Sequence, residues 1–270
     1  FVTQNGGTNA TSRIAAMRAV TESHTFSIDS YRDWTIDWSQ SPNGHLYSNK
    51  APGGMFIGLP IFFVTDQWKQ FFYHEKKDEL SRLPQPGYMQ TTILVFLTQV
   101  IPFCILVLLF TNYLATLGFA PTTLHFFALA AFFGNTAAIL MNSYFGHGLA
   151  AIFLLAAIYF LLQRKYFWCA FHFGFATLTD YGGITLLPGF ALAILWQERQ
   201  ELKNIGGVIG KIILGALLPA TLWIWYHWVC FGSPLALASQ FISPTQVTLP
   251  EKPGIPEAFA VFELLFGESR

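Results

Sequence analysis

Long apolar stretches separated by short polar connections dominate the chain after residue 90. They cover residues 91–115, 122–141, 147–163, 166–180, 182–196 and 207–229. A helix that crosses the hydrocarbon core of a bilayer needs roughly 20 predominantly apolar residues, so the shorter stretches need polar residues at their ends. The pattern predicts six transmembrane helices, and therefore an all-α, polytopic transmembrane helical bundle.

The segment from residue 51 to residue 90 differs from these stretches. Residues 51–64 are apolar, but Asp66, Gln67 and Lys69 follow at once, so the apolar run is too short to span a bilayer. We expect a half-helix at the membrane interface. If residues 51–72 instead formed a true span, every later connection would change sides of the membrane.

The first 50 residues are polar, with charges of both signs and several turn signals. Within them, Ile14, Met17 and Val20 recur at helical spacing and predict a short helix over residues 10–21. We expect this helix to lie on the membrane surface.

Composition agrees with a membrane protein. The chain is 53% hydrophobic and 17% aromatic, and 11% of its residues are charged, whereas soluble domains carry about 25% charged residues. Its formal net charge is zero, so no overall positive field attracts nucleic acid, and partners are selected by local sites. The three cysteines are far apart and lie in or beside apolar runs, a pattern that indicates neither a disulfide framework nor a metal site.

The distribution of Lys and Arg predicts the orientation. Placing residues 1–90 outside puts the basic connections at 164–165 and 197–203 on the cytoplasmic side, as the positive-inside rule expects. The predicted organisation is an extracytoplasmic first loop (1–50), an interfacial half-helix with its outer connection (51–90), a six-helix transmembrane region (91–230) and an extracytoplasmic segment leading into a missing C-terminal part (231–270). The chain begins at Phe1 inside a polar stretch, so we expect it to be a piece of a longer protein.

This topology gathers polar residues from distant parts of the chain at the outer face. The first loop, the turn at residues 142–147, the pair Asp180-Tyr181 and the segment after Phe231 meet there. Asp180 is explained either as a helix cap or as part of an outer cavity. His147, at a predicted helix start, is either hydrogen-bonded locally or a site residue. The histidines inside or near apolar runs, His172 and His227, are predicted to be structural.

Residues 37–53 hold the densest group of polar residues. Lys50 comes directly before Ala51-Pro52-Gly53, which places an ammonium group beside the unpaired backbone N–H groups of a helix start. That combination suits a phosphate, and at an outer membrane face the phosphate belongs to a lipid headgroup or a lipid-linked sugar. The alternative is an interfacial anchor, with Lys50 and Tyr47 at headgroup depth.

The stretch GHLYSNKAPG (residues 44–53), followed by an apolar half-helix, resembles the end of the first extracytoplasmic loop of GT-C membrane glycosyltransferases. This superfamily includes the protein O-mannosyltransferases and the lipid A aminoarabinose transferases. Four further segments resemble bacterial glycosyltransferase-like members, in order along the chain: QNGGTNATSRIAAMRAV with TFSID (4–20 and 25–29), SYFGHGLAA (143–151), ATLTDYGG (176–183) and WYHWVCFGSPL (225–235).

The resemblance implies a GT-C fold with a large first outer loop, in the inner (plasma) membrane of a bacterium. It also implies transfer of a sugar, with inversion, from a polyprenyl-phosphate-linked donor to an extracytoplasmic glycan, lipid or protein acceptor. Lys50 matches the lysine of the Lys-Pro-Pro type motif that meets the donor phosphate. No nicotinamide, flavin, haem or nucleic acid is implied, and a requirement for a divalent metal is left open.

One departure from the superfamily concerns the general base. Members carry an acidic pair or a lone Asp shortly before an arginine, and alignment on Arg13 puts Ala10 and Thr11 at those positions. Because an inverting transfer needs a group that deprotonates the acceptor hydroxyl, we expect Asp37 to serve, with Asp29 as the second candidate. The alternative for each is a solvated loop carboxylate.

Two functions from different classes follow. The first is a GT-C-like transferase that binds its substrates through Lys50 and Arg13. This hypothesis predicts a first-loop carboxylate within several ångströms of Lys50. Its cavity would be shaped by the remaining polar residues of the outer face: His45, Tyr47, Asn49, His147, Asp180 and Tyr181. The second is a non-catalytic protein that binds or translocates a lipid-linked glycan, which the missing acidic pair favours. A secondary transporter is a third and weaker hypothesis, because no internal repeat is evident.

Overall fold

The computed structural model describes residues 7–72, 88–134, 143–200 and 205–242, and these residues are mostly helical. The α-helices are α1 (Gly7–Ser23), α2 (Gly53–Phe72), α4 (Tyr88–Val95), α5 (Ile101–Thr116), α6 (Pro121–Phe133), α8 (Gly146–Leu162), α9 (Tyr166–Thr179), α10 (Leu187–Glu198) and α11 (Ile205–Phe231). The shorter elements are the 3-10 helices η1 (Asp29–Trp34), η4 (Tyr181–Leu186) and η6 (Ala238–Phe241), the π-helix η3 (Phe96–Val100), and the strands β1 (Trp38–Gln40) and β2 (Leu46–Ser48). The predicted all-α class is confirmed, with one small hairpin added.

Two of the helices are long and apolar enough, by length and composition, to cross a membrane: Gln90–Thr116 and Ile205–Phe231. They correspond to the stretches predicted at 91–115 and 207–229. Helices α6 and α8 are apolar but shorter, and the end of the stretch predicted at 122–141 lies outside the described residues. The stretch predicted at 182–196 begins not as an α-helix but as the 3-10 helix η4. The Asp180 side chain accepts a hydrogen bond from the N–H of Gly182, and Gly182 and Gly183 are consecutive glycines.

The long helix Gln90–Thr116 contains a π-helical turn, η3, directly before α5. Pro102 lies in the first turn of α5, where it has no N–H to donate and where its ring would clash with the carbonyl one turn earlier. A π-turn relieves that conflict without ending the helix.

Helix α2 corrects the prediction of a half-helix over 51–64. It runs from Gly53 to Phe72 and continues past Asp66, because a charged residue does not by itself end a helix. Its start is defined by Pro52, whose carbonyl accepts a hydrogen bond from the N–H of Phe56. α2 is not among the helices long and apolar enough to cross a membrane.

Helix α1 is buried on nearly all sides and does not lie on a surface as predicted. Ala15, Met17 and Ala19 are fully buried, and the arginines Arg13 and Arg18 are only 5% and 6% exposed. Small alanines around most of its circumference let α2 and the rest of the first loop pack closely against it. Sequence periodicity therefore located the helix but not its environment.

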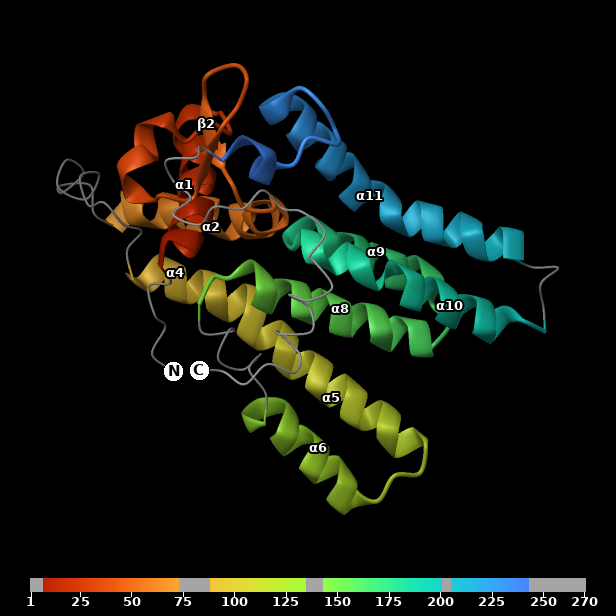
Figure 1. Cartoon of the computed structure of the whole chain (residues 1–270). Coiled ribbons are helices and arrows are strands. Elements are labelled where there is room, and N and C mark those ends of the chain that lie inside the picture. The colour runs from red at the N-terminus through yellow and green to blue at the C-terminus, as the bar shows by residue number, and fades with distance from the viewer. Residues whose placement is uncertain (1–6, 73–87, 135–142, 201–204, 243–270) are drawn as a thin grey trace, which may run out of the picture.

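The hairpin joins the first loop to the end of α11. Its strands pair antiparallel, with Ser39 opposite Tyr47. Ser39 donates a hydrogen bond to the carbonyl of Ala238 at 2.6 Å, and Ser41 donates one to the carbonyl of Cys230. Figure 1 shows the first loop, in red and orange, gathered at the end of the bundle that α11 reaches with its last turn.

Within the bundle, α9 packs most extensively against α8 and α11. Glycines permit this close approach: a Cβ at Gly215 would lie 2.1 Å from the carbonyl oxygen of Phe167, and one at Gly174 would lie 2.4 Å from Pro219. Large apolar side chains cover the outward faces of the long helices, among them Ile105, Leu108, Ile213, Leu217 and Trp228. Such extensive exposed apolar surface is typical of a face that meets lipid or another protein.

The helices alternate in direction, so four junctions meet at one end of the bundle (Figure 1). They are the first loop, the turn leading into α8, the junction of α9 with η4, and the segment after α11. Contacts establish this arrangement, since Gly53 touches Thr179, Gly146 touches Arg13, and Ser41 bonds to Cys230. The described parts of these segments therefore come together, as predicted; their place at the outer membrane face stays a prediction, and residues 243–270 lie outside the described residues.

Candidate functional site

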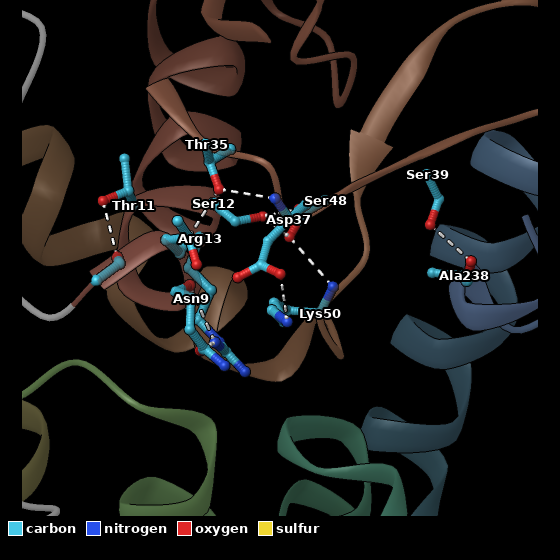
Figure 2. A network of polar contacts seen from close by, with 12 residues as sticks. Asn9, Thr11, Ser12, Arg13, Thr35, Asp37, Ser39, Ser48, Lys50 and Ala238 are labelled. Carbon is cyan, nitrogen blue, oxygen red and sulfur yellow. Dashed lines mark hydrogen bonds and ion pairs between the residues drawn. The ribbon is translucent and has the colours of Figure 1, made fainter. Parts of the chain in front are cut away.

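Lys50 and Asp37 form an ion pair, with 3.1 Å between Nζ and Oδ1. Asp37 directly precedes β1, and Lys50 lies in the short connection between β2 and α2, so the hairpin brings the two together. Their side chains are 22% and 20% exposed, which leaves the pair accessible. Figure 2 shows the carboxylate of Asp37 turned toward the ammonium of Lys50. A first-loop carboxylate near Lys50, as the transferase hypothesis predicts, is therefore present.

The backbone of Asp37 is held by hydrogen bonds from three sides. Ser12 Oγ donates to its carbonyl at 2.6 Å, and the N–H of Asn49 donates to the same carbonyl at 3.2 Å. Its own N–H donates to Thr35 Oγ1 at 3.0 Å. These bonds tie α1, the hairpin and the loop before β1 together, so the ion pair has a defined position.

Arg13 is a buried cation without a carboxylate partner. It donates hydrogen bonds to the carbonyl and the side-chain oxygen of Asn9, and its Nε has no hydrogen-bond partner. It forms no ion pair with any acidic residue in the described part of the chain. Burial lowers the pKa of Arg13, while the charges of Tyr144, Asp180 and Asp37 oppose that shift. A guanidinium remains charged in proteins, so this positive charge is incompletely compensated.

Glycines surround the Arg13 guanidinium. A Cβ at Gly146 would lie 2.3 Å from Nη2, and one at Gly54 would lie 3.0 Å from Nε. Gly146 is the first residue of α8, so Arg13 lies at the end of that helix where the unpaired N–H groups and the positive dipole end are found. Two positive features thus meet, an arrangement that favours an anion.

His147 and Asp180 form a second pair at this face. Nδ1 of His147 contacts Oδ2 of Asp180, whose Oδ1 accepts a hydrogen bond from the N–H of Gly182 at 3.0 Å. The side chains are 64% and 28% exposed. The first explanation offered for Asp180, a helix cap, is confirmed, since its side chain caps η4. Its place in an outer cavity stays a prediction.

Tyr181 lies behind this pair and is tied to α11. Its hydroxyl is 3.0 Å from Nε2 of His227, whose Nδ1 is 2.8 Å from the carbonyl of Trp223. The carbonyl requires the proton on Nδ1, so Nε2 accepts from the tyrosine. Burial raises the pKa of Tyr181, which keeps the phenol neutral. The structural role predicted for His227 agrees with its complete burial.

Three residues predicted for the site lie elsewhere or are otherwise engaged. His45 Nδ1 is 2.6 Å from Asp29 Oδ2, and Asp29 Oδ1 accepts from the N–H of Leu46 at 2.7 Å, so this pair fastens the hairpin to η1. Tyr47 is 5% exposed and packs on Phe231 instead of lining a cavity. Because both oxygens of Asp29 are occupied, the geometry does not favour it as a base.

Asp29 is expected to contribute to stability in a pH-dependent way. Burial alone would raise its pKa, but the hydrogen bonds from His45, the Leu46 N–H and Ser27 outweigh burial and lower it. A carboxyl group whose pKa is lower in the folded state than in the unfolded state stabilises the protein at pH values above its unfolded-state pKa. That contribution is lost as the pH falls through the folded-state pKa. Thermal unfolding from pH 7 to pH 3 should therefore show a smaller acid-induced decrease in Asp29→Asn than in the wild type.

Asn49 is the remaining predicted residue beside Lys50, and its side-chain Oδ1 is buried without a hydrogen-bond partner. Sequence reasoning did not identify the residues that support the site: Ser12, Thr35, Ser48, Gly54, Tyr144 and Gly146. Tyr144 is 1% exposed and donates its hydroxyl hydrogen to the carbonyl of Gly54. Only its place three residues before His147 could have pointed to it.

Comparison of the chain with protein-family models, with curated proteins and with solved structures gave no match. Among the described residues, no group of His, Cys, Asp and Glu is arranged to hold a metal ion, and the three cysteines are free.

Proposed function

We propose that the protein is a polytopic membrane glycosyltransferase of GT-C type that transfers a sugar from a polyprenyl-phosphate-linked donor to an extracytoplasmic acceptor. The observation that carries the proposal is the buried guanidinium of Arg13, which lacks a carboxylate partner and lies at the start of α8. Lys50 adds a second cation from the same end of an apolar bundle. This combination favours a phosphate attached to a lipid.

The membrane placement follows from the same arrangement. In the proposed topology the six helical segments after residue 90 cross the bilayer, and the first loop lies outside. Two long apolar helices and the exposed apolar faces of the bundle support this placement. The polar cluster then lies where the hydrocarbon core meets the outer aqueous phase, the position at which a lipid-linked phosphate is presented.

The transfer reaction requires stabilisation of the negative charge on its leaving group. The bond between the sugar C1 and a phosphate oxygen breaks, and negative charge grows on the departing phosphate. Arg13 and Lys50 stabilise that charge more strongly in the transition state than in the ground state, which accelerates the reaction. Gly54 and Gly146 lie directly against the Arg13 guanidinium, and Gly53 lets the start of α2 approach the end of α9.

Asp37 has a supporting part in this proposal. Its ion pair with Lys50 holds the ammonium group in place before the donor binds. A donor phosphate then competes with Asp37 for Lys50. Because the Asp37 carboxylate is engaged by the ammonium of Lys50, it does not stand free to meet an acceptor hydroxyl. This favours the alternative function of a protein that binds or translocates a lipid-linked glycan without catalysis.

The decisive experiment is a transfer assay with the full-length protein and radiolabelled polyprenyl-phosphate sugars. We expect Lys50→Ala to lower transfer at least tenfold, because a charge-assisted contact to phosphate is worth roughly 1.5–3 kcal/mol. Asp37→Asn keeps the Lys50 ammonium and removes the carboxylate that competes for it. This variant should bind polyprenyl phosphate at least as tightly as the wild type. Unchanged turnover in Lys50→Ala would contradict the proposal, as would a wild-type protein that neither binds nor consumes any of these lipids.

A further inference from the structure

We propose that His147 is the general base of the transfer and that Asp180 is its positioning residue. The inference rests on the proposed function and completes it, since the usual acidic pair is replaced by Ala10 and Thr11. It is carried by the contact between His147 and Asp180 beside the Arg13 guanidinium.

Among the carboxylates of this face, neither of the expected bases is free to accept a proton. Asp37 is engaged in its ion pair with the ammonium of Lys50, at 3.1 Å. Both carboxylate oxygens of Asp29 are occupied, one by the ring of His45 and the other by the N–H of Leu46. Among the described residues of the polar cluster, the imidazole of His147 is a group that can accept a proton near neutral pH.

The geometry of His147 fits that task. Its Nδ1 faces Asp180, so the proton sits on Nδ1 and the lone pair of Nε2 remains available. The side chain is 64% exposed, which leaves Nε2 open to an acceptor hydroxyl. Asp180 cannot rotate freely, because its second oxygen is held by the N–H of Gly182.

His147 is also correctly placed relative to the donor phosphate. It directly follows Gly146, which touches the Arg13 guanidinium, and Asp180 directly follows Thr179, which touches Gly53 at the start of α2. Arg13 from α1 is close enough to interact electrostatically with Asp180, and also with Asp37, Tyr144 and Tyr181. Asp37 in turn forms the ion pair with Lys50. The base and the phosphate cations thus belong to one cluster.

The step balances as follows. Nε2 of His147 takes the proton of the acceptor hydroxyl, whose oxygen forms a bond to C1 of the donor sugar. The bond between C1 and the phosphate oxygen breaks, and its electron pair leaves with polyprenyl phosphate beside Arg13 and Lys50. The imidazolium formed on His147 is stabilised by the Asp180 carboxylate, and it releases its proton to solvent.

The test compares His147→Gln, Asp180→Asn and His24→Gln in the full-length protein. His24 is an exposed histidine just after α1 and outside the cluster, so it provides the matched control. Transfer from the radiolabelled donor is measured from pH 5 to pH 9, and binding of polyprenyl phosphate is measured separately. We expect His147→Gln to lower kcat roughly 100-fold or more, with little change in polyprenyl phosphate binding.

The pH profile distinguishes a base from a merely structural residue. Wild-type transfer should rise with pH across the measured range, because only an unprotonated base can accept the proton of the acceptor hydroxyl, and that rise should be absent in His147→Gln. Asp180→Asn should lower kcat and alter the profile without weakening lipid binding, and His24→Gln should match the wild type.

The outcomes separate the two proposals. A wild type that transfers sugar while His147→Gln keeps both its kcat and its pH profile overturns the assignment of the base alone. A wild type that binds polyprenyl phosphate but transfers nothing establishes the non-catalytic alternative and overturns the base. Failure of the wild type to bind any such lipid overturns both.

Discussion

Replacing Arg13 with Met is expected to weaken donor binding strongly while leaving the protein at least as stable as the wild type. The guanidinium is 5% exposed and has no ion-pair partner in the described residues. Burying a charge costs several kcal/mol unless it is well compensated, and a hydrophobic residue of similar length avoids that cost. An arginine retained at such a cost is expected to act on a ligand.

The expected loss of polyprenyl phosphate binding in Arg13→Met is at least about 30-fold. This corresponds to roughly 2–5 kcal/mol for removing one partner of a desolvated, hydrogen-bonded charge pair. Binding of the lipid phosphate and the thermal midpoint would be measured on the same purified sample. The midpoint should be unchanged or higher.

Arg18 offers the matched control on the same helix. It is also buried, at 6% exposed, but it pairs with Glu22 at 3.2 Å and lies over the ring of Trp34. Arg18→Met should therefore lower the thermal midpoint and leave lipid binding unchanged. If Arg13→Met were destabilised as Arg18→Met is, and still bound the lipid, Arg13 would be a structural residue and the proposed phosphate site would be wrong.

Gly53→Ala is expected to impair both stability and transfer. A Cβ at this position would lie 2.5 Å from Thr179 Oγ1 and 2.6 Å from the backbone of Leu178 and Thr179. Backbone atoms cannot move aside as a flexible side chain can, so α2 and the end of α9 must separate. Overpacking of this kind costs about 1–3 kcal/mol.

The functional effect of Gly53→Ala follows from what the contact joins. Lys50 precedes Gly53 on one side, and Asp180 follows Thr179 on the other. A displacement on the order of 1 Å between groups that act together can cost roughly 100-fold in rate. We expect a lower thermal midpoint together with a loss of transfer at least tenfold.

Gly189→Ala provides the comparison for Gly53→Ala. A Cβ at Gly189, in α10, meets nothing within 4 Å, and alanine is favoured over glycine inside a helix by up to about 1 kcal/mol. The thermal midpoint and the transfer rate of Gly189→Ala should equal or exceed those of the wild type. If Gly53→Ala behaved in the same way, the close contact of α2 with α9 would not be needed for the site.

The sequence located most helices because hydrophobic periodicity and the length of apolar runs depend on local composition. It indicated the long helices around 91–115 and 207–229, the helix within residues 7–23, and the meeting of the 142–147 turn with Asp180 at one face. It missed the end of α2 at Phe72, because a change to charged residues does not by itself terminate a helix. It also missed the 3-10 start before α10, which depends on the cap formed by Asp180.

By itself, the sequence determined the apolar helical character of the chain, the order of its polar junctions, and the chemical types of the residues gathered at them. Only the tertiary structure decided which of those residues meet: Asp37 with Lys50, His147 with Asp180, and Asp29 with His45. The physical reason is that pairing between distant residues depends on how helices approach one another. That approach is controlled by contacts such as Gly53 on Thr179 and Gly146 on Arg13, which no local pattern of residues encodes.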